Sequence, residues 1–241
     1  MTHWDASADA WVAHLGDAGD ATRRDVLDAP MVAALPDAGH ALDIGCGEGR
    51  FCRMMQAAGL TTVGLDPTVA LLDTARVRDP DGAYVRGDAA YLPFPDDHFD
   101  VVVFYLSLID IPDMPAAITE AARVLRPGGR LLIANLHAHA TARPRDWGGE
   151  GGNWAQDRRF WCIDDMMQER GNWASWNGIR ILNHHRPLSA YMAAFLNAGL
   201  TLRQFTDPPY TGADPEIADK FTRMPWAFLM AWDAPEPETL Q

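Results

Sequence analysis

Residues 42–49 read LDIGCGEG, in which an apolar run ends on an acid and glycines then occupy every second position. Glycine loses more conformational freedom on folding than any other residue, so three glycines in five positions need a reason. A strand, a glycine turn and the beginning of a helix together present backbone N–H groups and let a ligand approach the main chain closely. The stretch therefore predicts a ligand-binding turn at the end of a buried strand.

The sequence around this turn alternates between short β-rich runs and helical patterns over residues 40–135, which is typical of a parallel sheet wrapped by helices. The run FDVVVFYL at 99–106 is almost continuously apolar, as a strand buried on both faces requires. We expect strands at 40–44, 61–66, 83–88, 99–106, 130–135, 200–206 and 225–232, and helices after Gly49, after Pro67, at 114–125 and at 187–199.

Composition and charge set the class of protein. The 241 residues are 48% hydrophobic and 22% charged, and the net charge of −13 disfavours binding to nucleic acid or to an anionic membrane. The three cysteines form no CxxC pair, which favours a reducing compartment over a disulfide framework. Residues 1–11 lack the pattern of a signal peptide, and no apolar stretch has the length of a membrane span. We expect a cytoplasmic protein, and its oligomeric state stays open.

Two acids beside the glycine turn indicate which ligand it takes. Asp66 ends the second predicted strand, where a carboxylate in a doubly wound fold accepts hydrogen bonds from ribose hydroxyls. Asp43 lies two residues before Gly45, where it would repel a pyrophosphate and suit a positive group such as an α-amino group. The spacing GxGxG also differs from the dinucleotide pattern GxGxxG. A nucleoside ligand with a cationic end is therefore favoured over a dinucleotide.

Four ordered blocks resemble the class I S-adenosylmethionine-dependent methyltransferases, especially the small-molecule branch typified by quinone-biosynthesis enzymes. They are LDIGCGEG (42–49), VGLDPT (63–68), GDAAYLPFPDDHFDVVV (87–103) and ARVLRPGGRLLIAN (122–135). The resemblance implies an α/β fold, a doubly wound Rossmann-like sheet of seven strands, six parallel and the last antiparallel, with a cap insertion between strands five and six. We expect one domain over 1–241, with a cofactor half at 38–135, a cap at 136–186 and the last helix and strands at 187–232.

The resemblance also implies S-adenosyl-L-methionine as cofactor and assigns residues to its parts. The methionine portion would lie on the glycine turn near Asp43, the ribose on Asp66, and the adenine beside Pro67 or Thr68 with its amino group on Asp88. The end of the fourth strand would line the methyl region. The cofactor residues implied in this way are Asp43, Gly45, Cys46, Gly47, Asp66, Pro67, Thr68, Asp88, Ala89, Tyr105 and Leu106.

Methyl transfer from a sulfonium is an in-line displacement, which needs a general base only where the acceptor must shed a proton. Two residues near strand ends are candidates, Asp110 after the fourth strand and His137 after the fifth, although each is also compatible with a purely structural role. We expect no metal, because Asn135 stands where metal-dependent relatives carry an aspartate.

The predicted cap is the expected source of acceptor specificity. Its tryptophans would exclude water and hold an apolar or cationic acceptor, or would only pack the cap on the sheet. They are Trp147, Trp154, Trp161, Trp173 and Trp176. Trp4 and Trp11 predict an N-terminal helix that covers the cofactor or is a plain amphipathic stripe.

Other functions stay open at this point. The predicted activity is transfer of a methyl group to a small-molecule acceptor. A protein that binds the cofactor without turnover is compatible with the same residues, because a proximity mechanism needs no obligatory catalytic motif. A nicotinamide-dependent oxidoreductase is disfavoured by the glycine spacing, and nucleic-acid methylation by the absence of a basic stripe.

Overall fold

The run FDVVVFY forms the central strand β4 (Phe99–Tyr105) in the computed structural model, which describes residues 4–142 and 163–236. Its side chains alternate between two apolar layers, because successive residues of a strand point to opposite faces. Phe104 packs with Ile133 and Phe195 in one layer, and Tyr105 packs with Phe51 in the other. The strand is buried on both faces, as its apolar sequence predicts.

The main sheet has seven strands in the order β3-β2-β1-β4-β5-β9-β8. Strands β1 to β5 pair in parallel, and β9 runs antiparallel to both of its neighbours, β5 and β8. The predicted sheet of six parallel strands and an antiparallel last strand is therefore confirmed. The other strands are β1 (Gly39–Ile44), β2 (Leu60–Asp66), β3 (Ala83–Arg86), β5 (Leu125–Leu136), β8 (Thr201–Thr206) and β9 (Ala227–Asp233).

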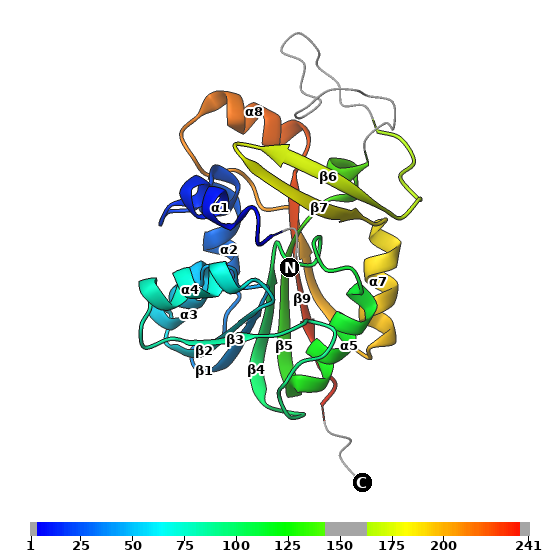
Figure 1. Cartoon of the computed structure of the whole chain (residues 1–241). Coiled ribbons are helices and arrows are strands. Elements are labelled where there is room, and N and C mark those ends of the chain that lie inside the picture. Colours follow the sequence, from blue (N-terminus) through cyan, green and yellow to red (C-terminus); the bar gives the residue numbers. More distant parts are fainter. Residues whose placement is uncertain (1–3, 143–162, 237–241) are drawn as a thin grey trace.

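Helices cover both faces of this sheet (Figure 1). α5 and α7 pack in the layer of Phe104, whereas the π-helical turn η1, α2 and α3 pack in the layer of Tyr105. α5 begins where Asp113 accepts a hydrogen bond from the Ala116 amide, with proline in the first turn. Their bounds are η1 (Arg23–Leu27), α2 (Asp28–Ala33), α3 (Arg50–Ala57), α5 (Met114–Val124) and α7 (Leu188–Asn197).

The remaining helices are α1 (Ala8–Leu15), α4 (Val69–Arg78), α6 (Ala138–Thr141) and α8 (Pro215–Arg223). α4 packs against β2 and β3, and α1 lies beside α4 and β7. Among the helices in the described ranges, none has the length and apolar character that a membrane crossing needs.

A two-stranded hairpin of β6 (Arg170–Trp176) and β7 (Ile179–His185) follows β5 in the chain, within the predicted cap. Figure 1 shows it lying across the end of the main sheet, and β7 contacts α1. Asn177 and Gly178 form its turn, both with positive φ (46° and 80°). The sequence reading expected no regular element here, although Asn-Gly is a strong hairpin signal. Trp147, Trp154 and Trp161 lie outside the described residues.

A candidate cofactor site at the glycine turn

The three glycines of the turn all have positive φ (78°, 55° and 76° for Gly45, Gly47 and Gly49). They differ in what lies at the position that a side chain would occupy. A Cβ on Gly45 would collide with Ser107, and a Cβ on Gly49 would collide with the Tyr84 ring. In the described part of the chain, a Cβ on Gly47 would meet no atom within 4 Å apart from its own chain neighbours. Gly45 and Gly49 are therefore small because the protein packs on them, whereas space beside Gly47 is open to a ligand.

Asp43, the penultimate residue of β1, is a buried carboxyl group with an unfilled acceptor. Its Oδ2 accepts a weak hydrogen bond from the Cys52 thiol at 3.6 Å, and within the described part of the chain its buried Oδ1 has no hydrogen-bond partner. Burial chiefly, with the negative charges of Asp66 and Glu48 adding to it and the Cys52 hydrogen bond opposing it, raises the pKa of Asp43 to about 7. Such an orphaned acceptor fits a cationic donor from a ligand, which would both satisfy Oδ1 and neutralise its charge.

Asp66 ties the glycine turn to the end of β2. One carboxylate oxygen accepts from the Gly47 amide at 2.9 Å, and the other accepts from the Thr68 amide at 2.8 Å. Burial raises the pKa of Asp66, against the lowering effect of these two donors. Each oxygen can accept a second hydrogen bond, so the geometry is compatible with a role toward ribose hydroxyls. Pro67 is exposed and Thr68 is buried beside it.

The segment after β3 lies next to Asp66, because the Gly87 amide donates to the Asp66 carbonyl at 3.2 Å. Asp88 is exposed, and its Oδ1 accepts from the Ala90 amide at 2.9 Å. The neighbouring Ala89 is buried. The chain therefore brings the ends of β1, β2 and β3 together at one edge of the sheet, as expected for parallel strands.

The end of β4 contributes an aromatic ring and a strained residue. The Tyr105 hydroxyl donates to Asp28 at 2.6 Å, and its ring lies 4.7 Å from that of Phe51. Asp28 also accepts from the Arg50 guanidinium, which in turn donates to the Ala18 carbonyl at 2.8 Å. Leu106 follows with a φ of 57°, a left-handed conformation that is costly for a bulky side chain. Backbone strain of this kind is concentrated at ligand sites.

The two catalytic candidates have different surroundings. Asp110 Oδ1 accepts from the Asn183 side-chain amide at 2.6 Å, and burial raises the pKa of Asp110 to about 7. His137 Nε2 lies 2.6 Å from Asp207 Oδ1, and its ring stacks on His139 with centroids 4.9 Å apart. The described contacts of His137 are on the β8–β9 side of the sheet, so the structure does not bring the two candidates together.

The hairpin holds the residues after β4, 106–112, which we call the post-β4 loop. Besides Asn183, the His184 amide donates to the Ile109 carbonyl at 2.6 Å. Arg186 follows β7 and donates to the carbonyl groups of Leu108, Ile111 and Pro112 (3.2, 2.7 and 2.8 Å). Sequence reasoning missed Asn183 and Arg186, since a hairpin signal gives no information about which loop the hairpin contacts.

The N-terminal segment packs against the hairpin and α4. Ser7 Oγ donates to the Arg180 carbonyl and accepts from the Arg180 amide, both at 3.0 Å. The rings of Trp4 and Trp11 pack edge to face with centroids 5.0 Å apart, and Trp11 packs in the same way against Trp176 at 6.4 Å. Trp11 therefore contacts the predicted cap, and Trp4 packs against Trp11.

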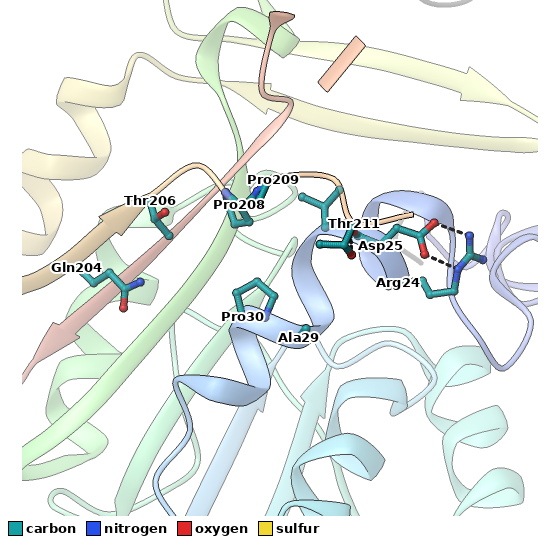
Figure 2. A pocket seen from close by; sticks show the side chains of 10 residues that line it. Arg24, Asp25, Ala29, Pro30, Gln204, Thr206, Pro208, Pro209 and Thr211 are labelled. Carbon is teal, nitrogen blue, oxygen red and sulfur yellow. Dashed lines mark hydrogen bonds and ion pairs between the residues drawn. The ribbon is translucent and has the colours of Figure 1, made fainter. Parts of the chain in front are cut away.

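A separate pocket of about 210 Å³ lies between η1, α2 and the residues around the end of β8. Figure 2 shows Pro30, Pro208 and Pro209 on its walls and the Arg24–Asp25 ion pair (2.8 and 2.6 Å) at one end. Its lining includes none of the predicted site residues. In the described ranges, no group of three or more His, Cys, Asp or Glu side chains is arranged to hold a metal ion.

Comparison with known proteins agrees with this geometry. Residues 42–133, which span the glycine turn, the acids and strands β1 to β5, match the family described as Methyltransferase domain. That stretch is similar to the class I S-adenosylmethionine-dependent methyltransferases. Its similarity lies with the quinone-biosynthesis-like branch of that family.

Two curated relatives of this methyltransferase family are a malonyl-(acyl-carrier protein) O-methyltransferase of Serratia marcescens and a demethylmenaquinone methyltransferase of Renibacterium salmoninarum. Each is 37% identical, over 55% and 51% of this chain and 52% and 50% of the relative. The chain therefore spans about half the length of the curated relatives it matches. A solved S-adenosylmethionine dependent methyltransferase from Mesorhizobium loti is 27% identical with a TM-score of 0.76, covering 90% of this chain and all of that one.

Proposed function

We propose that the chain transfers a methyl group from S-adenosylmethionine to a small-molecule acceptor. The observation that carries the proposal is the open space beside Gly47 together with the buried, unpartnered Oδ1 of Asp43. A ligand with a slender cationic end fits both features. The named activities of the curated relatives, which include methylation of demethylmenaquinone, support an acceptor of small-molecule type.

In this proposal, different residues bind different parts of the cofactor. The glycine turn, with Cys46 between Gly45 and Gly47, and the Asp43 carboxylate receive the amino-acid portion. The free acceptor positions of Asp66 receive the ribose hydroxyls, and Asp88 with the Ala89 amide receives the adenine, flanked by Pro67 and Thr68. Tyr105 and Leu106 border the methyl region.

The bound cofactor would supply an electrophilic methyl group on a sulfonium. The protein's task is then to orient the acceptor in line with the carbon–sulfur bond and to exclude water. The strained Leu106 and the hairpin over the strand ends are the parts of this chain that would shape the acceptor side. His137 stays a candidate for proton transfer only if an acceptor reaches the β8–β9 side.

Calorimetric titration with S-adenosylhomocysteine, S-adenosylmethionine and NAD tests the proposal. We expect the first two to bind and NAD not to bind. Asp88→Ala should weaken binding of S-adenosylhomocysteine about tenfold, the effect of one lost hydrogen bond. Asp81→Ala, which removes an exposed acid near the other end of β3, is the matched control. It should bind S-adenosylhomocysteine as tightly as the unmutated chain does.

The outcomes separate the alternatives. Binding of NAD alone would favour an oxidoreductase and overturn the proposal. If the adenosyl ligands bind but mass spectrometry detects no methyl transfer to any small-molecule acceptor, the chain is instead a protein that binds the cofactor without turnover.

A further inference from the structure

α7 presents a second apolar surface besides the one that it buries. Leu188 and Leu196 are 38% and 58% exposed, and Met192, midway between them, is half-buried. Residues four apart lie one above the other on the same side of a helix, so these three side chains form one stripe. Tyr191 and Phe195 face the sheet and are buried. The stripe therefore flanks the core-facing side of α7 and is open to solvent.

The edge strand β8 extends this apolar surface. β8 pairs with β9 and is the last strand in the order of the main sheet. Leu202 lies opposite Trp232 and Phe205 opposite Met230, which places both β8 side chains on the face of the sheet against which α7 packs. They are 36% and 40% exposed. We call the stripe of α7 together with Leu202 and Phe205 the α7–β8 face.

The α7–β8 face is uncharged, although the chain as a whole is acidic. No Asp, Glu, Lys or Arg occurs between Pro187 and Leu202, whereas charged residues make up 22% of the sequence. The charged residue of β8, Arg203, is neutralised by an ion pair with Asp233 at 2.8 Å. A strongly basic or acidic partner therefore gains no complementary charge here.

The overall charge of the chain favours a second copy on this face. Two copies that each carry a net charge of −13 repel each other, and the repulsion is least where the facing surfaces carry no charge. An anionic membrane, by contrast, would be repelled by the rest of the protein, with no basic residue in the stripe to offset the repulsion. A second copy is thus the occupant that suits both the apolar face and its acidic surroundings.

The stripe on α7 is also complementary to itself. Met192 is four residues from Leu188 and four from Leu196, so the stripe has the same spacing when it is read from either end. Two α7 helices that pack antiparallel bring Leu188 of each copy against Leu196 of the other, with Met192 at the centre. A two-fold interface requires a patch that matches itself in this way. The neighbouring Ser189 and Ala193 are small and exposed, which lets the helices approach closely.

We propose that the α7–β8 face joins two copies of this chain into a two-fold symmetric dimer, with α7 packed antiparallel on α7. The stripe supplies the apolar centre of the interface, and Leu202 and Phe205 extend it along the edge of the sheet. Burial of these side chains against the partner drives association, because it removes from water the apolar area that the single chain leaves exposed.

Sedimentation velocity of the full chain, from nanomolar to high micromolar concentration, tests the proposal. We expect a species of twice the chain mass of 26.6 kDa to dominate at micromolar concentration. Leu196→Lys places an unpaired charge in the interface and should raise the dissociation constant at least about a hundredfold. Val77→Lys is the matched control, because Val77 is 79% exposed on α4, outside the α7–β8 face. It should associate as the unmutated chain does.

Mixing two variants tests the antiparallel pairing itself. Leu188→Glu should be monomeric for the same reason as Leu196→Lys, and both should melt cooperatively in circular dichroism because the replaced side chains are exposed. In the mixture the introduced carboxylate meets the introduced ammonium, and the unchanged leucines meet each other on the other side of the axis. An equimolar mixture should therefore recover a dimer that contains one copy of each variant.

Three results would overturn the proposal. A chain that stays monomeric throughout the concentration range leaves the α7–β8 face to a different partner. A dimer that survives in Leu196→Lys uses another surface. Two monomeric variants that fail to associate when mixed would show that Leu188 and Leu196 do not meet across a two-fold axis.

Discussion

Replacement of Gly47 by alanine separates the ligand role of the glycine turn from its structural role. The added Cβ meets no protein atom within 4 Å, so the cost to the fold is limited to a left-handed backbone at φ 55°, about 1–2 kcal/mol. At this chain length that lowers the melting temperature by about 2–8 °C. The methyl group, however, occupies space proposed for the cofactor, and we expect S-adenosylhomocysteine to bind at least about tenfold more weakly, a loss of about 1.4 kcal/mol.

The matched control is Gly199→Ala. Gly199 also has positive φ (77°) and open space at its Cβ, but it precedes β8 at the opposite end of the parallel strands. Thermal unfolding should show a similar loss of stability in both variants, whereas calorimetry should show weaker binding in Gly47→Ala alone. Equal affinities for the cofactor in the two variants would refute the reasoning, because the space beside Gly47 would then hold no ligand.

Three further predictions concern buried charges. Between about pH 4 and pH 7 the folded chain keeps a proton on Asp43 that the unfolded chain loses, so the contribution of Asp43 to the free energy of unfolding should fall by up to about 4 kcal/mol as the pH rises. Asp43→Asn should remove that part of the fall in thermal melts across this range. Asp28→Ala leaves the buried Arg50 guanidinium without its carboxylate and should lower the free energy of unfolding by about 3–5 kcal/mol in urea titrations, against less than about 0.5 for the exposed Arg76→Ala. Tyr105→Phe removes one hydrogen bond to Asp28 and keeps the aromatic packing, so its loss in the same titrations should be intermediate, about 1.5 kcal/mol; a loss as large as that of Asp28→Ala would mean that the ring itself is misplaced.

The parallel half of the fold could be predicted from the sequence because its signals are local. The apolar run of β4, the glycine turn and the alternation of strands with helices each require only a short window of residues. The strand ends predicted from the sequence agree with those in the structure to within one or two residues, apart from β5. That strand begins at Leu125, five residues before the expected start, because Leu125 already pairs with Phe99 ahead of a register shift.

The acceptor side could not be predicted in the same way. The Asn177–Gly178 turn does indicate a hairpin, and the Asp110 carboxyl group was a candidate from its place after a strand. What the sequence lacks is the tertiary contact between them, which depends on how the hairpin folds back over the sheet. Sequence alone likewise could not indicate that both Asp66 oxygens hold backbone amides, or that the Tyr105 hydroxyl is occupied by Asp28.

The contact between Asn183 and Asp110 joins residues 73 positions apart, on either side of the strand that closes the cofactor half. The arrangement of the post-β4 loop therefore depends on two separate stretches of sequence that must match each other. A chimaera that received only the hairpin of a relative would keep the backbone carbonyls of the post-β4 loop as acceptors, but would keep the contact with the Asp110 carboxyl group only if the new hairpin carried a donor at the position of Asn183. An exchange with a relative that preserves these contacts requires both segments together, residues 106–112 and 170–186, with β5 between them left in place.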